Sequence, residues 1–229
     1  SKTYIQAIIK NDKFVNKCNT ECYIFVEDNP FYAEMGGQVA DKGYLKNNSC
    51  KLEVLDVIKC PNKQHLIKVR VLQGTIIKGE SILTHVDLDA RMATAKNHSA
   101  THLLQKTLQE VLGSSVHQAG SRVDDKNFRF DFTYRGRLSD QLLIDIEKKV
   151  IAKIRKNTKT KIQYMPITEA KKEGAMALFE DKYEDIVRVV TIGSSVELCG
   201  GTHVNNTQDI GAFAILKIEN KGSDRSEEH

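Results

Sequence analysis

The chain has 229 residues and a formal net charge of +4, and 40% of its residues are hydrophobic. These values describe a folded protein with one large core or two modest ones, and they exclude a disordered chain. No apolar run approaches the roughly 20 residues that span a bilayer, and the first residues contain no signal-peptide hydrophobic region. The five cysteines show no paired framework, which favours the reducing cytoplasm.

The first 90 residues are predicted to form the short strands of a small β-barrel. Clusters of Asn, Asp, Gly and Pro separate segments that are rich in β-branched residues and alternate partly between apolar and polar. Five or six strands of this kind are typical of a barrel. The clearest four are YIQAIIK, ECYIFVE, KLEVLDVIK and HLIKVRVL.

A glycine pair interrupts this barrel in FYAEMGGQVAD, residues 31–41. Gly36 and Gly37 allow close approach of the backbone to a ligand and present N–H groups to it. A hairpin turn explains the same pair equally well.

From residue 87 the hydrophobic period becomes helical and predicts a long helix that ends at Gly113. A second amphipathic helix is predicted over 139–157, with Ser139 as its N-cap. The other expected elements are a short helix over 168–179 and strands over 114–123, 127–134, 161–167, 186–192 and 211–219. The predicted fold class is therefore α+β. A small β-barrel module (1–90) precedes an antiparallel sheet covered by helices (91–220), and a flexible tail follows (221–229).

His98 and His102 lie four residues apart on the first helix, which places both imidazoles on one face. At 100° per residue they fall opposite the apolar side of that helix, so they are not part of its hydrophobic seam. If only these two histidines are considered, a solvent-exposed pair explains their spacing as well as a metal site does.

ELCGGTH places Cys199 and His203 four residues apart in a loop whose two glycines let both side chains point inward. Together with His98 and His102 they supply one thiolate and three imidazoles, a set that suits Zn²⁺. Four protein ligands are typical of a structural zinc, whereas a catalytic zinc keeps a position for water. The spacing leaves both roles open.

The segment FRFDF alternates between an aromatic and a polar face. Its aromatic side, Phe128 to Tyr134, is predicted to be buried, which leaves Arg129 and Asp131 on the other surface. An ion pair exposed to solvent would give the same pattern. Upstream, Gln118 offers an amide that can donate and accept before a glycine turn.

Four motifs of the second module resemble, in order, those of the editing domain of alanyl-tRNA synthetases: NHSATHLL, QAGSRVDDKNFRFDF, EAKKEGAMALFEDKY and ELCGGTHV. FYAEMGGQVAD is similar to the glycine-rich motif of the barrel that precedes this domain in the family. Freestanding AlaX-type editing proteins share the architecture, and threonyl-tRNA synthetases carry a related domain. GAMALFEDKY is more similar to the form embedded in a synthetase.

By this resemblance, the activity is hydrolysis of the ester that joins a wrong amino acid, serine or glycine, to tRNA(Ala). A pocket that fits a methyl group cannot strongly reject an added hydroxyl or the smaller glycine, so a second site is needed. The resemblance implies one zinc ion on the four ligands and an active-site role for Gln118. It also implies that ATP and Mg²⁺ act only in an aminoacylation domain outside this chain, in the rest of the synthetase.

We expect zinc to hold the substrate or a water near the ester. Gln118 and the N–H groups of Gly36 and Gly37 would stabilise the developing oxyanion. Arg129 would hold the terminal adenosine or its phosphate, and Asp131 would orient Arg129 or a ligand imidazole.

Basic side chains on the two long helices are expected to contact the phosphates of the tRNA acceptor end. A solvated helix face explains them equally well. They are Arg91, Lys96, Lys148, Lys149, Lys153, Arg155 and Lys156.

Three other functions remain open at this stage. The chain could be a freestanding trans-editing protein of the AlaX type. It could be a non-catalytic tRNA-binding module in which zinc only joins a helix to a loop, or a metal-dependent hydrolase of a small ester unrelated to RNA.

Overall fold

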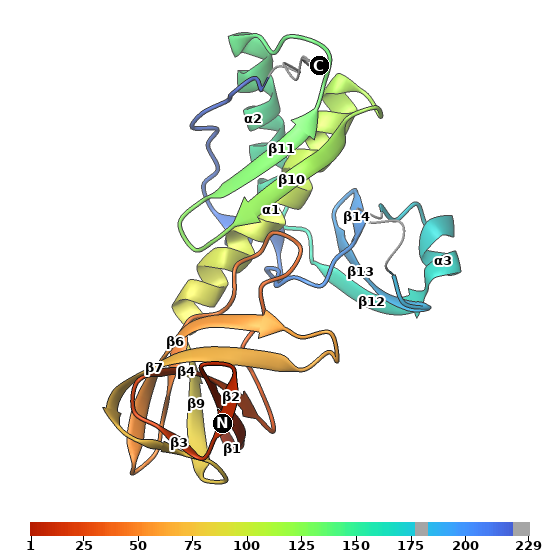
Figure 1. Cartoon of the computed structure of the whole chain (residues 1–229). Helices are drawn as coiled ribbons and strands as arrows, with labels where there is room; N and C mark the ends of the chain where they lie inside the picture. Colours follow the sequence, from red (N-terminus) through yellow and green to blue (C-terminus); the bar gives the residue numbers. More distant parts are fainter. Residues whose placement is uncertain (177–182, 222–229) are drawn as a thin grey trace, which may run out of the picture.

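The computed structural model describes residues 1–176 and 183–221 (Figure 1). Its N-terminal part is a closed antiparallel barrel of six strands, so the predicted barrel is confirmed. Around the barrel the order is β1 (Lys2–Lys10), β4 (Glu21–Val26), β7 (His65–Gly74), β6 (Cys50–Lys59), β5 (Gly43–Lys46) and β9 (Ser81–Val86), which pairs back with β1. Shorter strands flank them: β2 (Lys13–Val15), β3 (Lys17–Cys18) and β8 (Ile76–Ile77).

The barrel interior is filled by apolar side chains from alternate positions of its strands. In β4, for example, Cys22, Ile24 and Val26 are buried while the residues between them are not. Leu45 of β5 and Leu52 of β6 are fully buried in the same core. This period of two is the pattern that the sequence shows in β1, β4, β6 and β7.

Two long helices form the centre of the second part. Helix α1 (Leu88–Leu112) follows directly on the barrel, and its first turn is capped by the carboxylate of Asp87. Helix α2 (Asp140–Arg155) is capped by Ser139 Oγ, which accepts from Leu142 N at 3.1 Å. The predicted end of the first helix at Gly113 and the predicted cap at Ser139 are confirmed.

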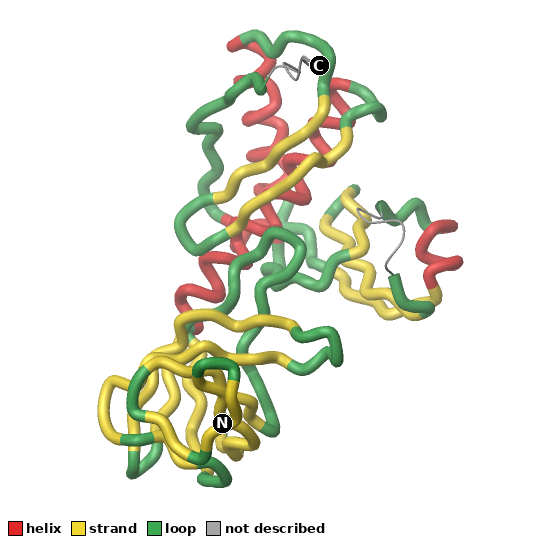
Figure 2. Tube along the Cα trace, in the orientation of Figure 1, coloured by secondary structure: helices red, strands yellow, loops and turns green. Residues whose placement is uncertain are grey.

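Two antiparallel sheets lie beside these helices (Figure 2). The hairpin of β10 (His117–Val123) and β11 (Phe128–Thr133) runs across α1 and α2. The second sheet contains β12 (Lys161–Pro166), β13 (Ile186–Ile192) and β14 (Ser195–Leu198), with α3 (Ile167–Lys172) beside it. A short 3-10 helix, η1 (Thr207–Ile210), packs against α1 and α2. The predicted α+β class, a barrel followed by helices against antiparallel sheets, is confirmed.

The aromatic face of β11 points inward as predicted. Phe128 packs against the core shared by α1, α2 and β13, and Phe130 and Phe132 pack against the neighbouring core around Ile146. Tyr134 lies beyond the end of the strand and is 37% exposed.

Two expectations about local structure are wrong. Residues 211–219 form no strand, although they are apolar and alternating. No strand edge in the described part of the chain pairs with them. Phe213 stacks against Phe128, and Ile215 N donates to Glu147 of α2 at 2.9 Å. Conversely, β14 immediately precedes the metal-binding loop, where we expected no strand. It has only four residues and is stabilised by its antiparallel pairing with β13.

The short helix predicted over 168–179 is present as α3, which ends at Lys172. Part of that prediction, residues 177–179, lies outside the described residues, as does most of the predicted tail over 221–229. The division of the chain near residue 90 stays a prediction. None of the described helices combines the length and the apolar composition of a membrane span.

Candidate metal centre

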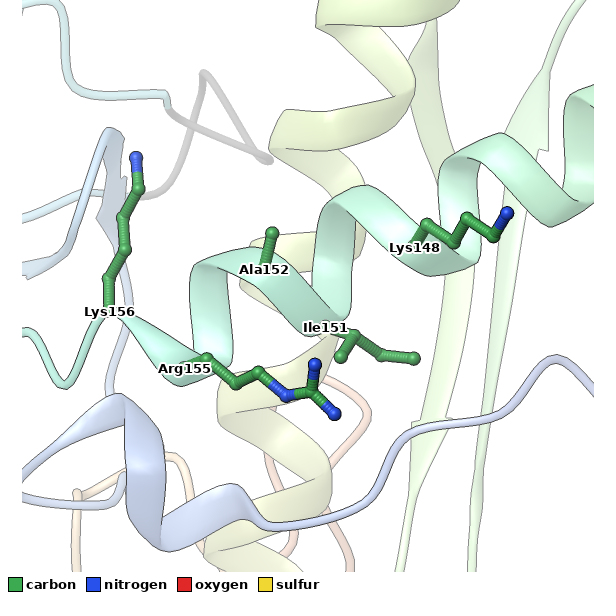
Figure 3. A pocket seen from close by; sticks show the side chains of 5 residues that line it. All are labelled: Lys148, Ile151, Ala152, Arg155 and Lys156. Atoms are coloured by element: carbon green, nitrogen blue, oxygen red, sulfur yellow. The ribbon is translucent and has the colours of Figure 1, made fainter.

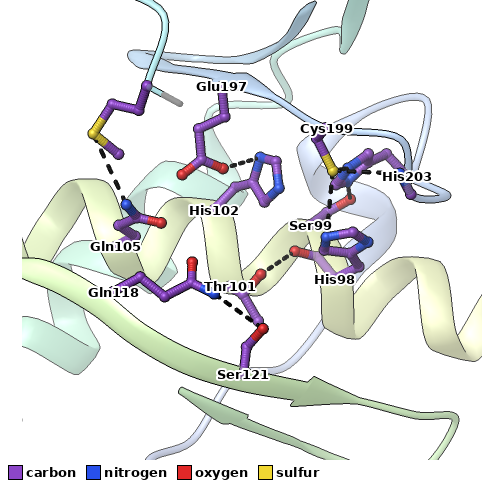
Figure 4. Close-up of polar contacts among 12 residues, drawn as sticks. His98, Ser99, Thr101, His102, Gln105, Gln118, Ser121, Glu197, Cys199 and His203 are labelled. Carbon is purple, nitrogen blue, oxygen red and sulfur yellow. Dashed lines mark hydrogen bonds and ion pairs between the residues drawn. The ribbon is translucent and has the colours of Figure 1, made fainter. Parts of the chain in front are cut away.

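The middle of α1 presents two histidines that are buried on the side facing away from its apolar seam. His98 is 7% exposed and His102 is 4% exposed. A solvent-exposed pair is therefore wrong. They are buried because the loop after β14 folds over them (Figure 4).

Cys199 and His203 of that loop complete a cluster with the two histidines. One ligand atom from each of the four residues lies within 4.8 Å of all the others. Cys199 Sγ is 3.5 Å from His98 Nε2 and 3.3 Å from His203 Nε2. The two ligand pairs predicted about a hundred residues apart thus meet at one point.

Glycine and arginine hold the loop in this shape. A Cβ at Gly201 would collide with the ring of His98 and the side chain of Gln38, so only glycine fits there. Arg188 of β13 donates through Nη1 to Cys199 O and Gly201 O, both at 2.8 Å. The expected inward fold of the loop is therefore present, and the structure adds the arginine that fixes it.

Each histidine of the cluster has its Nδ1 next to a different polar partner. His98 Nδ1 lies 2.8 Å from Gln38 Oε1 and His203 Nδ1 lies 3.0 Å from Ser99 Oγ. His102 Nδ1 lies 2.6 Å from Glu197 Oε2. A proton held at each Nδ1 leaves Nε2 free as a ligand atom, the arrangement common around protein-bound zinc. Three oriented imidazoles and one thiolate fit Zn²⁺.

Electrostatics in the cluster favour the thiolate. Burial raises the pKa of Cys199, but hydrogen bonds with the three histidines hold it well below its ordinary value. Burial lowers the pKa of His102, but the Glu197 carboxylate beside it raises that pKa to about 10. Burial and the charge of His102 lower the pKa of His203 to about 3. The surroundings of Cys199 therefore favour the thiolate, the form of the side chain that binds a metal cation.

The glycine pair of the barrel makes a two-residue hairpin turn between Met35 and Gln38, with φ of 59° at Gly36 and 87° at Gly37. A Cβ at Gly37 would collide with Ser121 of β10, and Gly37 O accepts from Val123 N at 2.8 Å. The close approach at Gly37 is thus to strand β10. Gly36 lines the cavity described next.

A cavity of about 460 Å³ opens beside the cluster. His98, His102 and Cys199 form one part of its wall, and Gln118 forms another. Gln118 Nε2 donates to Ser121 Oγ at 3.0 Å. Thr101, one turn along α1, also faces the cavity and donates to His98 O at 2.6 Å.

Arg129 and Asp131 are placed differently. Arg129 Nε lies 3.0 Å from Asp131 Oδ1, on side chains that are 60% and 35% exposed, and neither residue is among those that line the cavity. The pairing of Asp131 with Arg129 is one of the two arrangements expected. The carboxylate beside a ligand imidazole is Glu197, which the sequence analysis did not single out.

The basic side chains chosen as tRNA contacts have different surroundings. Arg91 pairs with Asp41 and donates to Pro30 O at 2.7 Å, so it ties α1 to the barrel. Lys153 pairs with Glu110 of α1 at 2.7 Å. Lys96 and Lys149 are exposed. A role of these side chains in binding tRNA stays a prediction.

A separate hollow lies on the outer face of α2 (Figure 3). The side chains that line it are Lys148, Ile151, Ala152, Arg155 and Lys156. It contains no metal-ligating side chain, so we assign the chemistry to the cavity beside the cluster and not to this basic hollow.

Gln38, Ser99, Glu197 and Arg188 support the site and were not predicted. Gln38 is 1% exposed and also accepts from Thr202 N at 2.9 Å, so the barrel loop reaches into the metal centre. Three of the four stand within or next to the motifs that contain the ligands or the glycine pair. These three residues could have been predicted from their closeness to the motifs, because zinc-bound histidines usually have a hydrogen-bond partner at the second ring nitrogen.

Comparison with known proteins identifies relatives. Residues 187–225 match the family model for the threonyl and alanyl tRNA synthetase second additional domain, and residues 1–90 match the model for class II (A) tRNA synthetases. Alanine–tRNA ligases of Listeria monocytogenes, Bacillus pumilus and Geobacillus kaustophilus are 46%, 46% and 47% identical to it, over 91%, 94% and 95% of its length. The chain is related to the alanine–tRNA ligases.

The resemblance noted in the sequence is thereby confirmed. The chain spans only about a quarter of each relative, namely 24% of the Listeria enzyme and 25% of the other two. The activity of a whole alanine–tRNA ligase is therefore not assigned to it. The function of this segment depends on the metal centre and the cavity that it contains.

Proposed function

We propose that this segment is the editing module of an alanyl-tRNA synthetase and hydrolyses the ester of serine or glycine mischarged to tRNA(Ala). The observation that carries the proposal is the convergence of His98, His102, Cys199 and His203 beside a cavity lined by polar side chains. Zinc would be held by these four residues and would supply positive charge next to the ester carbonyl or an attacking water.

The chain's own groups are arranged for a hydrolysis of this kind. Gln118 and Thr101 face the cavity and can hydrogen-bond to a serine hydroxyl or to an ester oxygen. Gly36 also lines the cavity and can present its backbone N–H to a developing negative charge. We propose Gln118 as the main polar contact, with Gly36 contributing and Gly37 supporting the turn through its contact with β10.

Discrimination against alanine follows from hydrogen bonding. A site built to pair with a hydroxyl leaves its polar groups unpaired when the substrate lacks that hydroxyl. Serine would satisfy these groups, whereas alanine would not.

The tRNA would approach over basic surface. The hollow on α2 gathers Lys148, Arg155 and Lys156 on one face, a suitable contact for backbone phosphates (Figure 3). Lys96 and Lys149 add further exposed positive charge. We retain Arg129 as a contact to the terminal nucleotide, since its side chain is 60% exposed.

The decisive experiment compares deacylation of Ser-tRNA(Ala) by the wild type, by the wild type with a zinc chelator, and by Cys199→Ala. Loss of a metal that stabilises the transition state should slow hydrolysis by roughly a hundredfold or more. Arg70→Lys, on the barrel surface, is the control that should keep full activity. Equal hydrolysis by the wild type and Cys199→Ala would refute the role of the metal centre.

A non-catalytic role is the second candidate, because four protein ligands fill a tetrahedron and such sites are usually structural. In that case chelation would unfold the second part of the chain, and tRNA binding by the metal-loaded protein would persist without any turnover. Hydrolysis of small esters without binding of tRNA at low salt would instead indicate a hydrolase unrelated to RNA.

A further inference from the structure

Glu197 of β14 is a buried carboxylate of which only one oxygen has a partner. The residue is 2% exposed. Its Oε2 lies 2.6 Å from His102 Nδ1. Its Oε1 is buried and meets no hydrogen-bond donor in the described part of the chain. A buried acceptor without a partner is unfavourable, and more so when it is charged, so we expect this oxygen to have a hydrogen-bond partner in the functional state.

Glu197 belongs to the wall of the cavity, and the two glutamine amides of the same wall do not donate to its unpaired oxygen. Glu197 lines the cavity together with Gln105 and Gln118. Gln118 Nε2 donates to Ser121 Oγ at 3.0 Å, and Gln105 Nε2 is directed at Met176 Sδ at 3.9 Å (Figure 4). Since Glu197 Oε1 has no donor among the described residues, a group bound in the cavity can supply one.

We propose that Glu197 Oε1 accepts a hydrogen bond from the α-ammonium group of the aminoacyl ester. This rests on the proposed function, since every aminoacyl ester carries that group on the carbon next to the carbonyl under attack. An ammonium supplies three N–H donors and a positive charge, and charge-assisted hydrogen bonds are among the strongest in proteins. Glu197 is then a substrate-binding carboxylate as well as the partner of His102.

A consequence concerns substrate class. An ester whose α-nitrogen is acylated has lost the positive charge and keeps a single N–H, and it brings extra bulk to the buried wall. The site should therefore select free aminoacyl esters over N-blocked ones such as peptidyl esters. This selectivity is independent of the side chain, so it adds to any preference for serine over alanine.

The test compares Ser-tRNA(Ala) with N-acetyl-Ser-tRNA(Ala) as substrates of the zinc-loaded wild type and of Glu197→Gln. We expect the wild type to hydrolyse the free amine roughly ten to a hundred times faster, the range implied by one charge-assisted hydrogen bond. Glu197→Gln should lose most of its rate on the free amine and little on the acetylated ester. Glu184→Gln, which removes an exposed carboxylate at the same cavity, should keep the wild-type preference.

A binding measurement separates this role from support of the metal. The affinity of 3′-serylamino-3′-deoxyadenosine, which cannot be hydrolysed as an ester, is measured by calorimetry beside its N-acetyl derivative, and zinc content is determined for each variant. The wild type should bind the free amine more tightly, and Glu197→Gln should bind both alike while retaining zinc. Equal binding of the two ligands by the wild type would overturn the inference.

Three further outcomes would also overturn it. If Glu197→Gln slows both substrates equally and loses zinc, the carboxylate acts only through His102. If the wild type hydrolyses both esters at the same rate, the ammonium is not recognised although the proposed function stands. If it hydrolyses neither ester, the proposed function itself fails, and the inference fails with it.

Discussion

At the scale of single residues, the metal centre depends on atoms that lie behind the ligands. Gln38, Ser99 and Glu197 each hold the Nδ1 side of one histidine ring, and they come from the barrel loop, α1 and β14. Such partners fix the ring orientation and raise the basicity of the ligand. The geometry of the centre is therefore set by three separate parts of the chain.

The glycine at 201 gives a sharp test of this packing. Gly201→Ala should weaken zinc binding by roughly tenfold or more, because the new methyl group collides with the ring of His98 and must displace a ligand. Gly200→Ala is the matched control, since its methyl group would meet only the flexible end of Met35, at 3.3 Å. Competition with a chromophoric chelator measures both affinities. Similar values for the two variants would contradict the packing argument.

The thiol of Cys199 should make the stability of the metal-free protein depend on pH. Its pKa is lowered on folding from an unfolded value of 9.0. A group of this kind stabilises the folded state fully above its unfolded pKa, and that contribution is lost as pH falls toward the folded pKa. The free energy of unfolding of the wild type relative to Cys199→Ser should thus grow as pH rises toward 9, by up to about 1.4 kcal/mol per pH unit.

Chemical denaturation of both metal-free proteins between about pH 6 and pH 9 checks this slope. Absorbance of the thiolate near 240 nm gives an independent reading and should persist at neutral pH in the wild type only. A stability difference that stays constant with pH would mean that Cys199 titrates as an ordinary thiol.

At the scale of elements, strand β13 positions the ligand loop. Its side chain Arg188 reaches the carbonyl oxygens of Cys199 and Gly201, and the loop begins where β14 ends beside it. The two ligands of α1 are separated by a single helical turn, so their spacing needs no such support. The loop does need it, because two consecutive glycines leave its backbone with many conformations.

Arg188→Lys tests this role of the arginine. A lysine ammonium on a flexible stem is not preorganised to hold both carbonyl oxygens as the guanidinium does. We expect zinc affinity to fall by about tenfold, the usual size of an effect from residues behind a ligand. Arg70→Lys, in an exposed pair with Glu21, is the control and should leave zinc affinity unchanged. Unchanged zinc affinity in Arg188→Lys would show that the arginine does not support the metal centre.

At the scale of the whole molecule, the barrel and the second part have separate hydrophobic cores but share the metal centre. The barrel core contains residues of β1 to β9 and the loop after β4, whereas α1 and α2 pack against β13. Gln38 connects them at His98, and Arg91 connects them at Asp41. Metal removal should therefore loosen one part more than the other.

Hydrogen exchange with and without a chelator measures that difference. Amide protection around residues 98–103 of α1 and in the loop over 199–204 should fall when zinc is removed, because four ligand contacts join them. Protection of β4 and β7 in the barrel should remain, since no ligand comes from these strands. Equal loss of protection in both parts would show that the chain folds as one unit that depends on the metal.

The sequence by itself determined the local elements and the identity of the ligands. Period-two alternation predicted β1, β4, β6 and β7, and the cap residues Ser139 and Gly113 predicted helix ends, because these patterns depend on neighbours along the chain. The residue types at 98, 102, 199 and 203 similarly limited the chemistry to a zinc-like metal.

Only the tertiary structure decided which residues meet. The strand expected over 211–219 is absent because no strand edge pairs with it, and β14 exists because β13 provides one. Gln38 and Glu197 became part of the site through contacts 60 and 95 positions away in the chain, at His98 and His102. Such contacts leave no local periodicity in a single sequence, since they depend on how separate elements pack against each other.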